Sequence, residues 1–165
     1  MYDAVYGLYT EDVGGNYVGG ECMTLEEALR KQVELCITME NYRCGVYVAS
    51  EDHFKAVCDI LLRTMRMYYI SKYYKNPYGA FIIDFTSFSK LKVIMPKESI
   101  RGRKYHGLVI DSEIDIETKN ILIYPSLFPR REESWNFESW DTVKSRVFEV
   151  DFSEENTEEN KNGEM

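Results

Sequence analysis

The chain has 165 residues, of which 44% are hydrophobic, and a formal net charge of −8 at pH 7. This length and apolar content suit one domain with a hydrophobic core and exclude general disorder. No apolar run is long enough to span a bilayer and no early apolar segment resembles a signal peptide, so we expect a cytoplasmic protein that does not bind membranes.

The N-terminal part of the chain predicts a β-hairpin followed by a helix. Tyr2–Tyr9 alternates loosely as a strand, and the glycines after it predict a hairpin with Tyr17–Cys22 as the returning strand. Thr24 and Glu27 then form a capping-box pattern, which predicts a helix that ends near Asn41.

A third strand and a second helix follow directly. Gly45–Ala49 is a short apolar strand, and Ser50 after it is a favourable N-cap for the second helix. Apolar residues continue at helical spacing from Phe54 to Tyr68, so we expect this helix to end just before the turn signal at 76–79.

Short apolar segments after this turn predict further strands and a loop-rich second half. The predicted strands are Ala80–Phe85, Leu91–Met95, Leu108–Ile110, Ile121–Tyr124 and Phe148–Phe152. The first two of them form a hairpin, and Pro96–Gly107 is a loop. The fold class is therefore α/β, with a mixed β-sheet and two main helices in a single domain over residues 1–152. Residues 153–165 hold five acids and one lysine and are expected to form a disordered acidic tail.

Charge is distributed unevenly along the chain. Residues 1–53 hold 10 acids and 3 bases, residues 54–104 hold 3 acids and 11 bases, and residues 105–165 hold 15 acids and 6 bases. A basic block between two acidic blocks bears on the choice of partner, because charge steers association.

The cysteines and histidines do not form a metal-binding pattern. None of the four cysteines belongs to a Cys-x-x-Cys pair, and the only histidines are His53 and His106. A structural zinc site normally needs closely spaced pairs of such ligands. We therefore predict free thiols, no metal site and two histidines on the surface.

Three segments together resemble the ATPase half of a viral terminase large subunit, the motor that packages DNA into capsids. Gly45–Met65 resembles the strand and helix that follow the phosphate-binding loop of that family. IIDFTSFSKLKVI, followed by ESIRGRKYHG, resembles its hairpin and Arg-Gly loop. GLVIDSEID resembles its Walker B strand. The resemblance covers residues 45–115 and implies a P-loop-like fold.

The resemblance implies a nucleotide site that has lost chemical groups. Gly15 and Gly20 have the spacing of a phosphate-binding loop, but Glu21 stands where the family has its lysine. A carboxylate there repels phosphate. Asp111 and Glu113 would take part in a magnesium and nucleotide site, with Glu113 one position beyond that of the catalytic glutamate. The same patterns also suit a plain hairpin turn and an ordinary core strand.

Two other patterns suggest different chemistry. Asp111 with the Glu117-Thr118-Lys119 segment supplies the residue types of a metal-dependent nuclease, although the gap is short. The basic block interleaves cations with tyrosines, which can bind single-stranded nucleic acid by charge and stacking. The residues predicted to make contacts with a partner are Arg101, Arg103, Lys104, Tyr105, Tyr73 and Tyr74.

Three functions follow from these patterns. The first is a non-catalytic phage or mobile-element protein, without cofactor, that binds a protein target and inhibits a nucleic-acid-handling enzyme such as a host defence nuclease. The second is a terminase-like ATPase or packaging accessory protein that binds Mg-ATP. The third is a single-stranded nucleic-acid binder that uses the central basic block. No catalytic residue is assigned, and the oligomeric state is left open.

Overall fold

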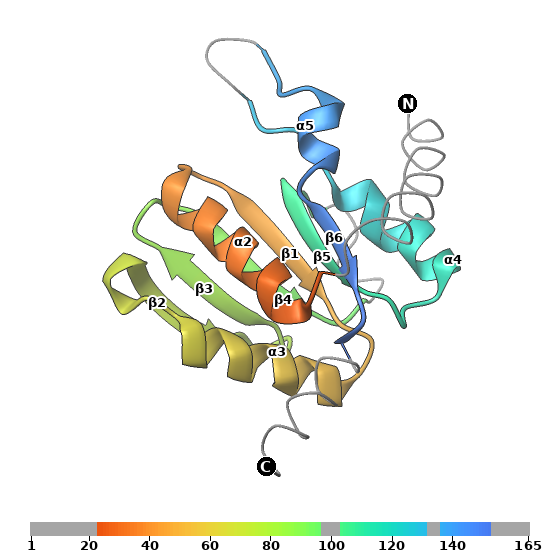
Figure 1. Ribbon diagram of the computed structural model, residues 1–165, viewed down its shortest axis with the longest axis horizontal. Coiled ribbons are helices and arrows are strands. Elements are labelled where there is room, and N and C mark those ends of the chain that lie inside the picture. Colours follow the sequence, from red (N-terminus) through yellow and green to blue (C-terminus); the bar gives the residue numbers. More distant parts are fainter. Residues whose placement is uncertain (1–22, 97–102, 132–135, 153–165) are drawn as a thin grey trace.

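The computed structural model describes residues 23–96, 103–131 and 136–152, which form an α/β domain around one six-stranded mixed sheet (Figure 1). The strand order across the sheet is β2-β3-β4-β1-β5-β6. The strands are β1 (Arg43–Tyr47), β2 (Ile70–Lys75), β3 (Phe81–Phe85), β4 (Lys90–Ile94), β5 (Gly107–Asp111) and β6 (Val147–Val150). The α/β class and the mixed sheet are confirmed.

Two long helices begin at the predicted caps. Helix α2 (Leu25–Thr38) starts after Thr24, whose side chain accepts from the Glu27 N–H, and the Glu27 side chain completes the capping box. Helix α3 (Glu51–Thr64) starts after Ser50, whose hydroxyl accepts from the His53 N–H. These are the two main helices, because α4 (Ile116–Thr118) and α5 (Trp140–Lys144) are short.

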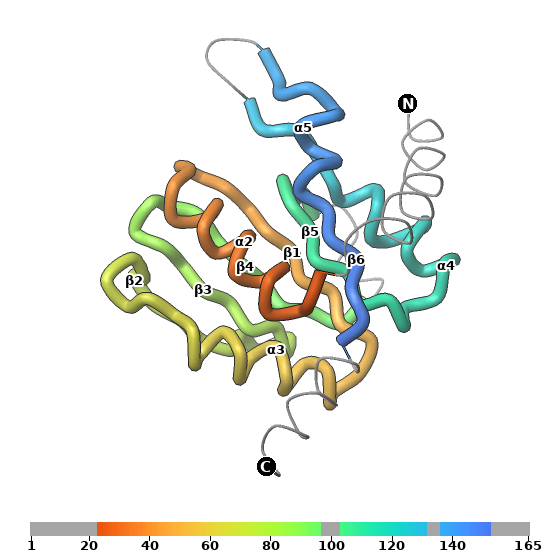
Figure 2. The backbone as a smooth tube through the Cα atoms, viewed as in Figure 1, coloured from red at the N-terminus to blue at the C-terminus, as the bar shows by residue number. Residues whose placement is uncertain are grey.

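The path of the chain sets the strand directions (Figure 2). It leaves β1 through α3 to the edge strand β2, and β2, β3 and β4 then pair as an antiparallel meander that returns to β1. Strands β4, β1, β5 and β6 are mutually parallel neighbours. Since β5 lies on the far side of β1 from β4, the connection between β4 and β5 must cross β1.

The core lies on both faces of the sheet. Apolar residues of α2 and α3 pack with one set of strand side chains, among them Val46 and Val93. The opposite strand side chains, among them Tyr47 and Ile110, pack against residues 114–127 and Val143 of α5. This is a three-layer arrangement, with the sheet between two helical layers.

Several boundaries differ from the sequence predictions. The second helix ends at Thr64, and residues 70–75, predicted as its last turns, are the edge strand β2. Ile121–Tyr124, predicted as a strand, lies instead in a helical segment that runs through α4, the π-helical turn Lys119–Ile123 and the 3-10 turn Tyr124–Ser126. In both cases short apolar or aromatic runs fit either structure, and contacts distant in sequence decide between them.

Candidate functional site

A groove lined by basic side chains lies on the sheet face opposite α2 and α3. In strand β4, Leu91 and Val93 pack towards the two helices, so Lys90, Lys92 and Ile94 point to the other face. Arg43 pairs with Lys90 across the parallel ladder and therefore shares its face. The residues lining a hollow of about 340 Å³ there are Arg43, Lys90, Lys92, Arg103, Lys104 and Tyr105.

A second hollow continues from the first. It has a volume of about 370 Å³ and shares Lys92, Arg103 and Tyr105 with its neighbour, so the two form one continuous depression along β4, which we call the basic groove. Lys75 and the exposed Tyr78 also line this second hollow, which reaches the α3 side of the sheet: Glu51 of α3 lines it, and the Lys75 ammonium lies 5.4 Å from the centre of the Phe54 ring. Six basic residues and one acid, Glu51, line the groove among the residues that the structure describes.

The groove exists because the β4–β5 connection crosses β1 at a glycine. The Tyr105 ring packs directly on Gly45, where an added Cβ would lie only 2.9 Å from Tyr105 Cδ2. Tyr105 also meets Tyr47 edge to face, with ring centroids 6.1 Å apart. Anchored in this way, Tyr105 holds its neighbours Arg103 and Lys104 beside Lys92.

Among the described residues, few cations of the groove are paired with carboxylates. Within the described ranges, no ion pair joins Arg43, Lys92 or Arg103 to an acid, whereas Lys90 lies 3.5 Å from Asp84. Burial lowers the pKa of Lys92, and the charges of Arg103, Lys90 and Arg43 lower it further. The positive charge of Lys92 therefore costs free energy in the unliganded protein, and an anion bound in the groove would reduce that cost.

Besides the Lys92 ammonium, the groove contains the Tyr105 hydroxyl, a polar group without a partner among the described residues. Only 5% of Tyr105 is exposed. Burial raises the pKa of this phenol, so it stays protonated and can donate. Tyr105, predicted as a contact residue, is buried, and it lines both parts of the groove.

The other predicted contact residues fall in different places. Tyr73 pairs with Ile83 and Tyr74 with Ile82, so the two tyrosines point to opposite faces of β2, and only Tyr74 shares the face of the groove. The Lys104 ammonium lies 4.9 Å from the centre of the Phe128 ring. Arg101 and the predicted phosphate-loop residues Gly15 and Gly20 lie outside the described residues.

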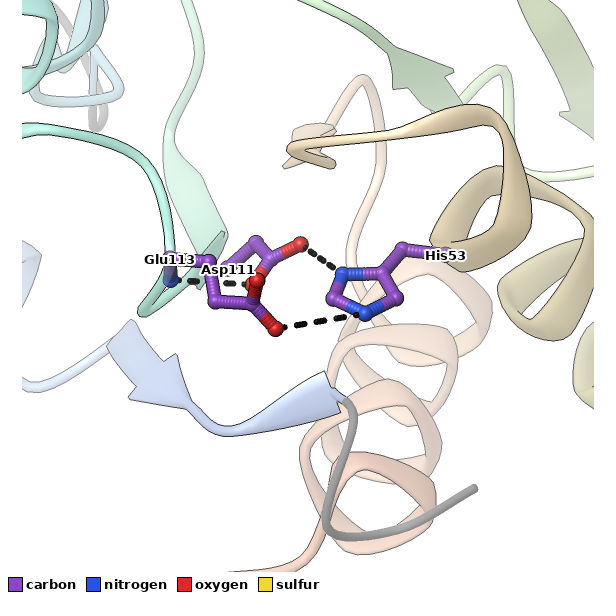
Figure 3. A group of neighbouring side chains, drawn as sticks. All are labelled: His53, Asp111 and Glu113. Atoms are coloured by element: carbon purple, nitrogen blue, oxygen red, sulfur yellow. Dashed lines mark hydrogen bonds and ion pairs between the residues drawn. The ribbon is translucent and has the colours of Figure 1, made fainter. Parts of the chain in front are cut away.

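A second cluster of polar side chains lies at the carboxyl edge of the sheet (Figure 3). His53 comes from the first turn of α3, Asp111 ends β5, and Glu113 follows two residues later. His53 Nδ1 lies 2.5 Å from Asp111 Oδ2, and His53 Nε2 lies 3.4 Å from Glu113 Oε2. We call these three residues the His–Asp–Glu cluster.

Asp111 is fully buried, and the fold itself uses its oxygens. Oδ2 accepts from the Ala49 N–H at 2.8 Å as well as from His53, and Oδ1 accepts from the Glu113 N–H at 3.1 Å. These bonds join the end of β1, the start of α3 and the end of β5. The predicted surface position of His53 is wrong, since only 6% of the residue is exposed.

The cluster lies where the sheet changes its direction of winding. The connection after β1 leads to β2, on the side of the sheet where β4 lies. The connection after β5 leads to β6, on the other side. In open α/β sheets, ligands bind in the crevice at the carboxyl ends of two such strands. The predicted E-x-K pattern adds no ligand to this cluster, because the Lys119 ammonium pairs with Glu149 at 3.2 Å and donates to the Ser112 carbonyl at 3.5 Å, and Glu117 lies outside the cluster.

Sequence reasoning named Asp111 and Glu113 as candidate site residues, but it missed Arg43 and the place of His53 beside the two acids. Lys90-x-Lys92 within an apolar strand signals a basic row on one face, but the addition of Arg43 depends on the β1–β4 register. A polar residue soon after one strand and an acid at the end of another indicate a shared polar site, because the carboxyl ends of parallel strands meet at one edge of the sheet.

No known protein family, curated protein or solved structure matches the chain. Among the described residues, no helix is both long and apolar enough to cross a membrane. The assignment of function therefore rests on the two sites described above.

Proposed function

We propose that this protein binds single-stranded nucleic acid in the basic groove, as a non-catalytic binding protein. The supporting observation is that six basic side chains converge there, three of them without an ion pair among the described residues. Such a groove suits the closely spaced phosphates of a nucleic-acid backbone.

Aromatic groups add a reason to favour a nucleic acid over a simple anion. Tyr78 is 83% exposed and lines the same groove as Lys92 and Arg103. An exposed ring beside a phosphate-binding row can stack on an unpaired base, which double-stranded DNA does not offer. The groove follows β4 for about 13 Å from Lys90 to Ile94, so it would hold a short single-stranded segment.

The other hypotheses stay predictions from the sequence. A phage origin, inhibition of a host nuclease and a terminase-like relation rest on residue patterns. Binding of Mg-ATP requires the glycine loop at Gly15 and Gly20, which lies outside the described residues. None of these hypotheses uses Arg43, Lys90 and Lys92 together.

Fluorescence anisotropy with a labelled oligo-dT of about 12 nucleotides at about 50 mM salt tests the proposal. The double variant Arg103→Ala/Lys104→Ala should weaken binding and lower the slope of log K against log salt by about 1.4, since each phosphate contact contributes about 0.7 for single strands. The matched control, Lys31→Ala/Lys55→Ala, removes the same charge from two exposed positions of α2 and α3 that do not line the groove, and should bind normally.

Three outcomes would overturn the proposal. They are the absence of binding at low salt, equal weakening by the control variant, and stronger binding of an acidic polypeptide such as polyglutamate than of the oligonucleotide. The last result would assign the groove to a protein with an acidic segment.

A further inference from the structure

The contact with Asp111 fixes the protonation pattern of His53. The Asp111 carboxylate oxygen, 2.5 Å from His53 Nδ1, can only accept, so Nδ1 carries a proton and donates. In a neutral imidazole, Nε2 then has a free lone pair. This is the orientation that carboxylate partners give to metal-binding histidines.

The free lone pair faces another acceptor. Glu113 Oε2 lies 3.4 Å from His53 Nε2, and an ionised carboxylate offers no proton. Two acceptors facing each other repel unless a cation lies between them. Either a second proton on His53 or a metal ion would satisfy both atoms.

The spacing suits a tetrahedral metal ion. With metal–ligand bonds of about 2.0–2.1 Å and tetrahedral angles, two ligand atoms on one zinc ion lie about 3.3–3.4 Å apart. The observed Nε2–Oε2 distance of 3.4 Å agrees with this value. An imidazole with a carboxylate suits zinc-like ions, whereas magnesium prefers an octahedral set of oxygens.

The surroundings favour a cation and allow it to enter. The Glu113 side chain is 53% exposed, so one side of the pair is open to solvent for further water ligands. Glu51 and Asp52 in the first turn of α3 add negative charge near His53 and oppose the positive end of the helix dipole.

We propose that His53 Nε2 and Glu113 bind a zinc-class divalent transition-metal ion, with Asp111 as the residue that orients His53. The site is independent of the basic groove and of the proposed nucleic-acid binding. Water completes the coordination, so the ion would retain exchangeable positions, as ions outside closed structural sites do.

The described cysteines are poor competitors for such an ion. Burial raises the pKa of Cys36 and Cys44 well above the ordinary value for a thiol, and burial raises the pKa of Cys58 to about 11. These thiols therefore stay protonated near neutral pH, whereas metal binding needs the thiolate.

Calorimetric titration of chelator-treated protein with Zn²⁺, together with visible absorption on addition of Co²⁺, tests the site. The wild type should bind one ion per chain, with Co²⁺ bands typical of low coordination, and excess Mg²⁺ should not displace the ion. Glu113→Gln, at a half-exposed position, should weaken Zn²⁺ binding at least about tenfold. Glu117→Gln, an exposed position in α4, is the matched control and should bind as the wild type does.

A nitrogen NMR spectrum of His53 separates the metal from the proton. On addition of Zn²⁺, the Nε2 resonance should shift to that of a metal-bound nitrogen while Nδ1 stays protonated. Failure of Zn²⁺ to bind, unchanged affinity in Glu113→Gln, or a doubly protonated His53 in the presence of Zn²⁺ would each overturn the proposal. The test uses a substitution of Glu113, which is half exposed, and not of His53, whose burial makes its replacement a risk to folding.

Discussion

Glu138 and Arg146 form a bidentate ion pair that is almost fully removed from solvent. Arg146 Nη2 donates to Glu138 Oε1 at 2.6 Å, and Nη1 donates to Oε2 at 3.0 Å. Oε1 also accepts from the Arg130 N–H at 2.8 Å. Arg146 Nε donates to the His106 carbonyl just before β5, so this one pair ties the segment before α5 to the sheet.

The protonation of Glu138 should make the protein sensitive to acid. Burial alone would raise the pKa of Glu138, but the Arg146 side chain and the Arg130 N–H hold it below its ordinary value. The folded state therefore binds fewer protons, and this stabilisation is present above the unfolded pKa of about 4.3 and is lost as pH falls through the folded value. Removing the carboxylate at neutral pH should cost about 3–5 kcal/mol, because it leaves Arg146 as an unpaired buried charge.

Urea unfolding of the wild type and of Glu138→Gln checks this. The difference in the free energy of unfolding should be largest near pH 7 and should shrink as pH falls from about 5 towards 3. The exposed Glu117→Gln variant should show almost no difference at any pH. A pH-independent gap between the wild type and Glu138→Gln would contradict this prediction.

At the scale of elements, a buried amide joins α2 to the parallel strands. Gln32 of α2 is fully buried, and its Nε2 donates to the Arg146 carbonyl at 2.7 Å while its Oε1 accepts from the Tyr42 hydroxyl at 2.7 Å. Gly107, the first residue of β5, provides the space for this pair. A Cβ on Gly107 would lie 1.9 Å from the Tyr42 hydroxyl oxygen and 2.7 Å from Gln32 Oε1.

Gly107→Ala should therefore destabilise the fold by at least about 3 kcal/mol, because it combines overpacking with loss of a buried hydrogen bond. Gly79→Ala is the matched control: Gly79 has φ +90° but open space around it, so the cost there is conformational and about 1 kcal/mol. Thermal unfolding of both variants measures the difference. Equal effects would show that space at Gly107 is not the constraint.

The helices were more predictable than the strands because their signals are local. The capping box at Thr24 and the cap at Ser50 specify where α2 and α3 begin, although the end of α3 was predicted about three turns too late. Strand β2 was missed because the helical spacing of apolar residues runs on to Tyr68, just before it, and only its pairing with β3 decides the structure.

The candidate sites were predictable as regions but not as sets of residues. The basic block predicted cations near Arg103, but which of them converge depends on the β1–β4 register and on Tyr105 packing against Gly45. His53 was assigned to the surface because the sequence does not reveal that α3 begins beside the end of β5. The convergence of the cations and the position of His53 both depend on the strand order, which local sequence patterns do not specify.

At the scale of the whole molecule, the groove carries the opposite sign to the chain. The net charge is −8, yet the groove is lined by six basic residues and Glu51. A nucleic acid approaching the protein would therefore meet repulsion at long range and attraction only near the groove. Such repulsion slows association and selects against strands that cannot enter the groove.

Shortening the chain after Ser153 tests this balance. Removal of residues 154–165 takes away five acids and one lysine and so lowers the net negative charge by four. We expect tighter binding and faster association with oligo-dT at low salt, and the advantage should vanish near 1 M salt, where the screening length falls to about 3 Å. Stopped-flow anisotropy measures the association and dissociation rates, and their ratio gives the affinity.

A full-length variant in which the five acids of residues 154–165 are replaced by glutamine separates charge from bulk. If repulsion is the cause, this variant should associate at least as fast as the shortened chain and with a similar salt dependence, because it keeps the length and, with Lys161 retained, removes five negative charges against a net four. If only the shortened chain binds faster, the segment hinders access by its volume. Unchanged rates in both variants would mean that the field near the groove is set by the basic residues and Glu51, with no contribution from the C-terminal acids.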